Sequence, residues 1–208
     1  MRLTDEAPQK TSILAAVVSI LLALAAGAGA VEPATVKGTV SVQPAGTAAL
    51  QDVVVYVDGT IADATPPAQH ATVDQKDQQF VPHVVPVMAG TTVDFLNSDD
   101  VLHNAFSNSV AKKFDVGMFP RGESRSVVFD KAGVVDMRCN VHPKMRATVV
   151  VLDNPFFAVP RTDGSFSIAG LPPGRYKLRT WSESLKPAEK WVNLNAGEVL
   201  NVTLQLEK

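Results

Sequence analysis

Four side chains that can bind a soft metal ion occupy two short segments of the sequence. Cys139, His142 and Met145 form a C-x2-H-x2-M motif, and Cys139 is the only cysteine in the chain. His103 lies upstream, in the run DDVLHN that begins at Asp99. One thiolate, two imidazoles and one thioether are the ligand set of a blue-copper electron-transfer site. The sequence therefore predicts one copper ion per chain.

Each donor type has a distinct role in such a site. A coordinated cysteine loses its proton and is a soft ligand that suits copper, whereas a thioether is a weak axial ligand that tunes the reduction potential. Zinc is a poorer fit because its sites rarely include a thioether. A dinuclear copper centre with two bridging thiolates is excluded, since the chain has one cysteine.

The elements around these donors are predicted to be strands. Val134–Met137 and Ala147–Val151 flank the cysteine motif, and Val93–Leu96 precedes His103. A short loop between two strands would hold three donors in a fixed arrangement, with the fourth supplied from another strand end. Asp99 and Asp100 are interpreted as turn residues of the loop before His103.

The rest of the chain after residue 30 also favours strands. Apolar residues alternate with polar ones in short runs, and Gly, Pro, Asn or Asp separate the runs, which is typical of sandwiches and barrels. The sequence therefore predicts an all-β fold, with at most one short helical turn within 182–190. The predicted strands outside the metal segment include 36–42, 53–57, 165–168, 176–181 and 200–206.

Composition excludes several classes of partner. The chain has 208 residues and a formal net charge of −2, with basic residues scattered along it. This charge gives no basis for binding nucleic acid. No catalytic triad, phosphate-binding loop or carboxylate pair in a credible site was found, so we expect no enzyme activity and no catalytic residues.

Residues 1–30 have the features of a secretory signal peptide. Arg2 and Lys10 precede an apolar run from Ile13 to Ala26, and an A-x-A cleavage sequence ends at Ala30. An uncleaved membrane anchor is the alternative, since the run is nearly long enough to span a bilayer. With cleavage, the mature chain has no membrane span and is exported, and we expect it in the periplasm. A lone cysteine in an oxidising compartment is buried, paired with another chain or bound to a metal.

The segment 70–153 resembles the cupredoxins, the plastocyanin- and amicyanin-like blue copper proteins. The resemblance rests on Phe80-Val81-Pro82, the run AGTTVDFLNSD from Ala89, His103-Asn104, the run FDKAG from Phe129, and the spacing of the Cys139 loop. It implies a Greek-key sandwich in which His103, Cys139 and His142 are equatorial ligands and Met145 is axial. It also implies that Asn104 hydrogen-bonds to the cysteine loop. Electrons would pass through a partly exposed His142 to a docked redox partner protein.

The flanking segments, 31–69 and 154–208, resemble a carboxypeptidase regulatory-like (transthyretin-like) β-sandwich. The matching runs are VKGTV from Val36, VVVYV from Val53 and TDGSFSIAGLPPGRY from Thr162. Because each flank is too small for a core of its own, we expect the two to form one discontinuous sandwich. The cupredoxin segment would then be inserted into it or adjoin it. His70 and His83 match no ligand position and are interpreted as structural or solvent-facing.

These features favour an exported one-electron carrier with a mononuclear type 1 copper site. Two other functions stay open: a periplasmic copper-binding or delivery protein, and a β-sandwich interaction module without redox activity. Reversible reduction of a strongly coloured copper site would distinguish the first from both others.

Overall fold

The structure is a computed structural model, and it describes residues 31–43 and 50–208. Almost all regular structure in these ranges is β-strand, so the prediction of an all-β fold is confirmed. The predicted signal peptide, residues 1–30, lies outside the described residues. In the described ranges, no helix is long and apolar enough to cross a membrane.

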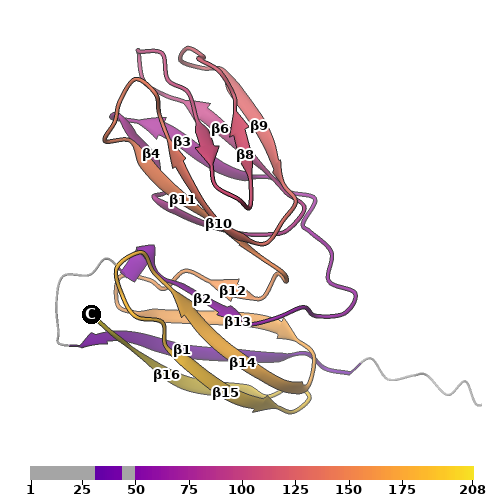
Figure 1. Cartoon of the computed structure of the whole chain (residues 1–208). Helices are drawn as coiled ribbons and strands as arrows, with labels where there is room; N and C mark the ends of the chain where they lie inside the picture. Colours follow the sequence, from indigo (N-terminus) through magenta and orange to yellow (C-terminus); the bar gives the residue numbers. More distant parts are fainter. Residues whose placement is uncertain (1–30, 44–49) are drawn as a thin grey trace, which may run out of the picture. The chain divides into compact units, whose positions relative to one another are not determined.

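One pair of sheets contains strands from both ends of the described chain. A three-stranded sheet has the order β13-β1-β16, and a four-stranded sheet has the order β12-β2-β14-β15. In Figure 1, β1 and β16 run side by side, and they pair in parallel from Thr35↔Val199 to Gln43↔Glu207. The strands are β1 (Ala34–Gln43), β2 (Val54–Val57), β12 (Phe157–Ala158), β13 (Ser165–Leu171), β14 (Gly174–Trp181), β15 (Glu189–Leu194) and β16 (Val199–Glu207).

Period-two patterning explains how this pair of sheets buries a core. In β16, Val202, Leu204 and Leu206 are buried while the residues between them are exposed, as expected for strands with one face on a core. These side chains join others from β1, β2 and β13–β15 in one hydrophobic cluster. A short 3-10 helix, η1 (Leu50–Asp52), precedes β2.

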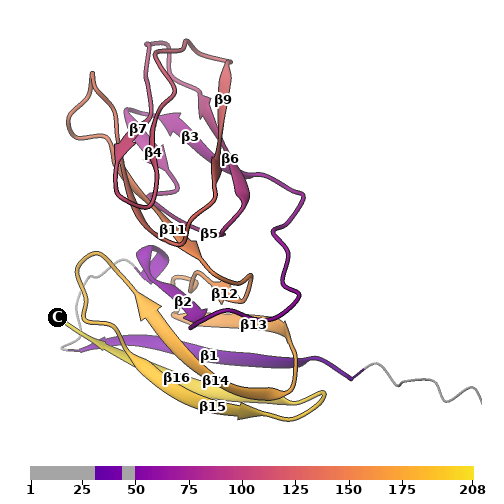
Figure 2. The ribbon, with the colours of Figure 1, turned by 45° about the vertical axis from the view of Figure 1, so that its right-hand side comes forward.

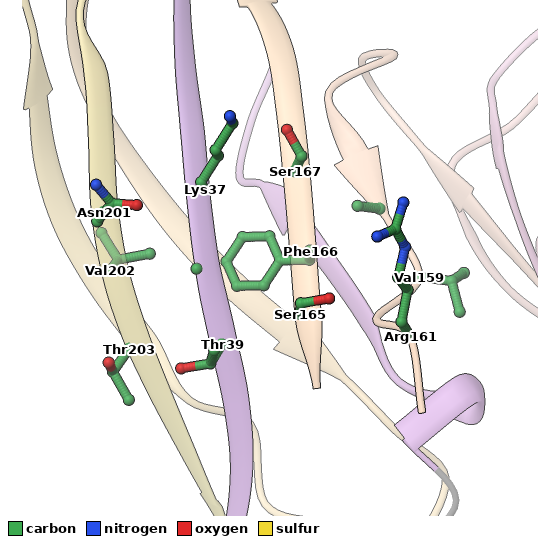
Figure 3. A pocket seen from close by; sticks show the side chains of 12 residues that line it. Lys37, Thr39, Val159, Arg161, Ser165, Phe166, Ser167, Asn201, Val202 and Thr203 are labelled. Carbon is green, nitrogen blue, oxygen red and sulfur yellow. The ribbon is translucent and has the colours of Figure 1, made fainter. Parts of the chain in front are cut away.

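The outer face of the three-stranded sheet carries polar side chains around a hollow of about 740 Å³. Figure 3 shows Lys37 and Thr39 on β1 between the flanking strands β13 and β16. Gly38 lies between these two residues, and a Cβ added there would lie 2.9 Å from the ring of Phe166. Close packing of β1 against Phe166 of β13 therefore requires glycine at this position.

The middle of the chain forms a second pair of sheets (Figure 2). Their orders are β4-β3-β6-β9 and β5-β11-β10-β7-β8. The strands are β3 (Ala71–Lys76), β4 (Gln79–Val81), β5 (Val84–Met88), β6 (Thr91–Asn97), β7 (Phe106–Asn108), β8 (Lys113–Asp115), β9 (Ser124–Phe129), β10 (Gly133–Arg138) and β11 (Arg146–Leu152).

A separate hydrophobic cluster fills the space between these two sheets. Its largest fully buried members include Phe95, Phe119 and Phe129, and it also contains Cys139 and Met145. The metal motif is therefore attached to a packed core, and both ends of its loop are fixed by strands.

The predicted helical turn within 182–190 was wrong. That segment contains no helix: residues 183–185 form bends, and β15 begins at Glu189. Its backbone groups bond to neighbouring strands: the Thr180 N–H donates to Ala188, and the Lys186 N–H donates to Glu207. Pro187 also favours an extended conformation in the residue before it.

Candidate metal centre

Three of the predicted donors converge on one point. The ligand atoms of His103, Cys139 and His142 all lie within 4.8 Å of one another. Cys139 Sγ is 3.9 Å from His103 Nδ1 and 4.0 Å from His142 Nδ1. The two Nδ1 atoms are 3.0 Å apart. His103 and Cys139, which are 36 positions apart in the sequence, thus face each other across a small space.

Strand ends place these donors. Cys139 directly follows β10, and β10 pairs with β11 from Gly133↔Val151 to Arg138↔Arg146. The donor loop is therefore a connection between two antiparallel neighbours. His103 comes from the segment between β6 and β7, where it forms a two-way backbone bridge with Phe119. Phe119 is fully buried, so the backbone of His103 is fixed to the core.

Burial distinguishes the two histidines. His103 is 0% exposed and Cys139 is 4% exposed, whereas His142 is only half-buried. His142 therefore joins the interior of the cluster to the protein surface.

Met145 closes the donor loop. Its side chain is buried in the same core cluster as Cys139. Its N–H donates to the carbonyl of His142 at 2.8 Å, which makes the loop a tight turn. Met145 immediately precedes β11, so its position is set by the strand.

The hydrogen bond expected from Asn104 to the cysteine loop is present. Asn104 Oδ1 accepts from the N–H of Asn140 at 2.8 Å. Its amide nitrogen donates to Asp115 Oδ1 at 3.1 Å, and that oxygen also accepts from the N–H of Gly117. The side chain of Asn104, which is buried, therefore connects the His103 segment to the Cys139 loop.

Asp99 has a contact that the sequence interpretation as a turn residue missed. The Nε2 of His103 donates to Asp99 Oδ2 at 2.8 Å. Burial raises the pKa of the Asp99 carboxyl, but hydrogen bonds from Gln78, His103 and Asp77 outweigh it and hold that pKa below its ordinary value. The sequence signal for this contact was the spacing: Asp99 lies four residues before His103, in a loop that can bring the carboxylate back to the imidazole.

The other two histidines lie outside the cluster. His70 Nδ1 donates to the carboxylate of Asp94 at 3.0–3.1 Å. His83 Nδ1 donates to the carbonyl of Arg146 at 3.0 Å. Neither belongs to the group of possible metal ligands found in the described residues.

The three donor atoms fit a single metal ion. A first-row ion such as zinc lies about 2.0–2.1 Å from an imidazole nitrogen and about 2.3 Å from a thiolate. One ion can therefore be shared by nitrogens up to about 4.1 Å apart, and by a nitrogen and a sulfur up to about 4.4 Å apart. The separations of 3.0, 3.9 and 4.0 Å fall within these limits. Cys139 also has no disulfide partner.

Comparison with known proteins supports a cupredoxin relationship for the middle of the chain. Residues 67–152, under half of the chain, match the family described as copper binding proteins, plastocyanin/azurin family. Amicyanin from Paracoccus versutus is 28% identical over 109 residues, which cover 51% of this chain and 83% of that protein. Residues 67–152 contain all four predicted donors.

Two solved structures are similar to part of the chain. The crystal structure of amicyanin from Paracoccus versutus is 26% identical and covers 47% of this chain and 96% of its own, with a TM-score of 0.37. A purple cupredoxin from Nitrosopumilus maritimus is 27% identical and covers 39% of this chain and 98% of its own, with a TM-score of 0.36. The carboxypeptidase regulatory-like resemblance of the flanking segments stays a prediction.

Proposed function

We propose that this protein is an exported one-electron carrier with a mononuclear type 1 copper site. His103, Cys139 and His142 would be the equatorial ligands, and Met145 the weak axial ligand. The observation that carries this proposal is the convergence of two imidazole nitrogens and the only thiol of the chain within 4.8 Å. The match of residues 67–152 to a copper-binding family supports the choice of metal.

Copper would supply the change of oxidation state, and the chain's own residues would keep the site rigid. Cys139, Met145 and His103 are buried in or fixed to the core, and Asn104 ties the two ligand segments together. Fast electron transfer requires that the ligands move little when copper changes its oxidation state, and a rigid site would meet this requirement.

His142 is the proposed exit for the electron. It lines a hollow of about 810 Å³ beside the donor loop. The side chains around this hollow combine apolar groups, such as Val141 and Pro143, with the cations Lys144 and Arg146. We propose that a redox partner protein docks here, because apolar surface favours association and charged side chains orient the partner.

The remaining parts of the proposal concern organisation and location. We propose a discontinuous sandwich from 31–69 and 154–208, with the cupredoxin domain at 70–153. Two hydrophobic clusters support this division, since each is drawn from one of the two strand groups. A smaller third cluster, Val54, Val84, Val150 and Leu152, draws on both groups. The signal-like sequence of residues 1–30 supports export, and we propose the periplasm as the location.

An absorption spectrum of the purified protein with added Cu(II) tests the function. We expect an intense visible band from charge transfer between the Cys139 thiolate and copper, together with reversible one-electron reduction. Cys139→Ser should abolish the band. Protein with intact Cys139 that takes up no Cu(II) would rule out the electron carrier.

The second candidate, copper delivery, predicts a different result. Labile copper that passes to an apo-acceptor without reversible reduction would favour delivery over electron transfer. The buried positions of His103 and Cys139 favour a retained ion, because release requires opening of a packed loop.

A further inference from the structure

The carboxylate of Asp99 contacts three groups at once. It accepts a hydrogen bond from His103 Nε2 at 2.8 Å. Its Oδ1 accepts from the backbone N–H of Asp77 at 2.7 Å, and its Oδ2 accepts from the N–H of Gln78 at 2.9 Å. The side chain of Asp99 is only 14% exposed, and that of His103 is fully buried. This carboxylate is therefore fixed in place from two sides.

A tight turn supplies the two backbone donors. Asp77 and Gln78 connect β3 to β4, and the pair Lys76↔Gln79 closes the hairpin. Their φ angles are +53° and +55°, which is the conformation of a two-residue type I′ turn. Left-handed backbone is unfavourable for most residues other than glycine. Hydrogen bonds from successive N–H groups to Asp99 help to offset that cost, because such groups form a concave site for an anion.

The hydrogen bond also sets the tautomer of His103. An ionised carboxylate only accepts hydrogen bonds, so Nε2 of His103 carries the proton. Nδ1 then presents its lone pair to the space shared with Cys139 and His142, at 3.9 and 3.0 Å from their donor atoms. Only this tautomer leaves Nδ1 free to bind a metal ion.

We propose that Asp99, held by the β3–β4 turn, is a positioning residue for the metal site, and that its charge lowers the reduction potential. The inference rests on the proposed copper function. A carboxylate that accepts from a ligating imidazole fixes the ring and raises its basicity. A more basic imidazole stabilises Cu(II) more than Cu(I), so the oxidised state is favoured.

Asp100 provides a matched control because it carries the same charge one residue further along. Its side chain is 84% exposed, and it pairs with Arg121, whose side chain is 61% exposed. The carboxylate of Asp100 accepts its hydrogen bond from Arg121, whereas that of Asp99 accepts from His103. A general effect of losing one negative charge near the site should therefore appear equally in Asp99→Asn and Asp100→Asn.

The first test compares these two variants with the natural full-length protein. In Asp99→Asn we expect Cu(II) affinity to fall by about tenfold or more, the usual effect of removing such an outer partner. Cu(I) affinity should fall less, so the midpoint potential rises. A tenfold change in the affinity ratio corresponds to about 59 mV for one electron. Asp100→Asn should match the natural protein, and equal shifts in both variants would overturn the proposal.

A second test changes the turn and leaves the carboxylate intact. Gln78→Gly keeps the N–H donor and tolerates φ of +55°, so the potential should not change. Gln78→Val disfavours that conformation and should raise the potential by less than Asp99→Asn does. This pair keeps the proposal testable if Asp99→Asn does not fold. An unchanged potential in Gln78→Val, with the turn shown to be displaced, would contradict the role of the turn.

A copper-free measurement separates this inference from the proposed function. Nitrogen NMR of the metal-free protein at neutral pH should show His103 protonated at Nε2 in the natural protein and in Asp100→Asn. Asp99→Ala should lose that preference. If the natural protein binds no copper, the proposed function fails. The NMR comparison of the natural protein with Asp99→Ala still tests whether Asp99 sets the tautomer of His103. A tautomer that does not depend on Asp99 would overturn the inference by itself.

Discussion

At the scale of single residues, the four proposed ligands divide into three that are buried and one that reaches the surface. His103, Cys139 and Met145 are 0–4% exposed, so their donor atoms are shielded from water. His142 is half-buried and lines the hollow beside the loop. Under the proposed function, the buried ligands would hold the copper ion and His142 would contact the redox partner.

Replacing Met145 by Leu should keep copper bound and raise the reduction potential. The change nearly conserves side-chain volume, so we expect it to destabilise the fold by less than about 1.5 kcal/mol. Loss of a weak axial donor removes an interaction that favours Cu(II). Voltammetry measures the shift. Met137→Leu is the control, because Met137 is equally buried in the same cluster but lies on β10 rather than in the loop. Complete loss of copper would show that Met145 is more than a weak ligand.

At the scale of elements, the site depends on hydrogen bonds that join loops to each other. Asn104 links the segment after β6 to the loop after β10. The turn between β3 and β4 holds Asp99. Neither link joins neighbouring residues in the sequence, so the folded sheets must bring the partners together.

Asn104→Ala should loosen the donor loop without unfolding the protein. The N–H of Asn140 would lose its partner, and we expect a loss of about 0.5–1.5 kcal/mol in the free energy of unfolding. Urea denaturation measures this loss. Asn108→Ala is the matched control, since Asn108 is exposed at the end of β7. Stability unchanged in both variants would mean that the bond contributes nothing to holding the loop.

The pairing of β6 with β9 predicts a pH dependence of stability. Asp94 and Ser126 are cross-strand partners, and the Ser126 hydroxyl donates to the Asp94 carboxylate at 2.6 Å. This bond, together with His70, outweighs burial and holds the pKa of Asp94 below its ordinary 3.8. Since the folded-state pKa is lowered, the stabilisation is present above pH 3.8 and is lost as the pH falls through the lower, folded-state value.

Ser126→Ala should therefore destabilise the protein at pH 7 by about 0.5–1 kcal/mol. The difference from the natural protein should shrink as the pH falls below 3.8. Chemical denaturation at a series of pH values measures this trend, and Ser124→Ala on the same strand is the control. A difference that does not vary with pH would show that the bond does not depend on the charge of Asp94.

Patterning in the sequence predicts the strands that flank the donors, β6, β10 and β11, but not the shorter strands β3, β4, β5, β7 and β8. Contacts over long distances explain other features that it missed. The alternation in β16 and the apolar runs in β10 and β11 have local signals. The hydrogen bond of Asp99 has none beyond its spacing from His103, because its other partners lie in the β3–β4 turn more than 20 residues away. The segment 182–190 was misjudged for the same reason, since its backbone partners include the distant Glu207.

At the scale of the whole molecule, each of the two groups of strands has its own hydrophobic cluster, and a smaller third cluster contains residues of both groups. One group contains β3 to β11, and the other unites β1 and β2 with β12 to β16. A binding site attached to one cluster should stabilise that cluster first. The division into a cupredoxin domain and a discontinuous sandwich is therefore testable by local stability.

Copper should slow amide hydrogen exchange chiefly in β3 to β11. Copper at about 100 times its dissociation constant stabilises the folded state that binds it by about 2.7 kcal/mol, and exchange reports such stability element by element. Leu204→Ala is the complementary change, because Leu204 is 2% exposed in the cluster of β1 and β16. It should cost about 2–5 kcal/mol and speed exchange chiefly in β1, β13 and β16. Equal changes in both groups of strands, from copper and from the substitution, would show that they unfold as one unit.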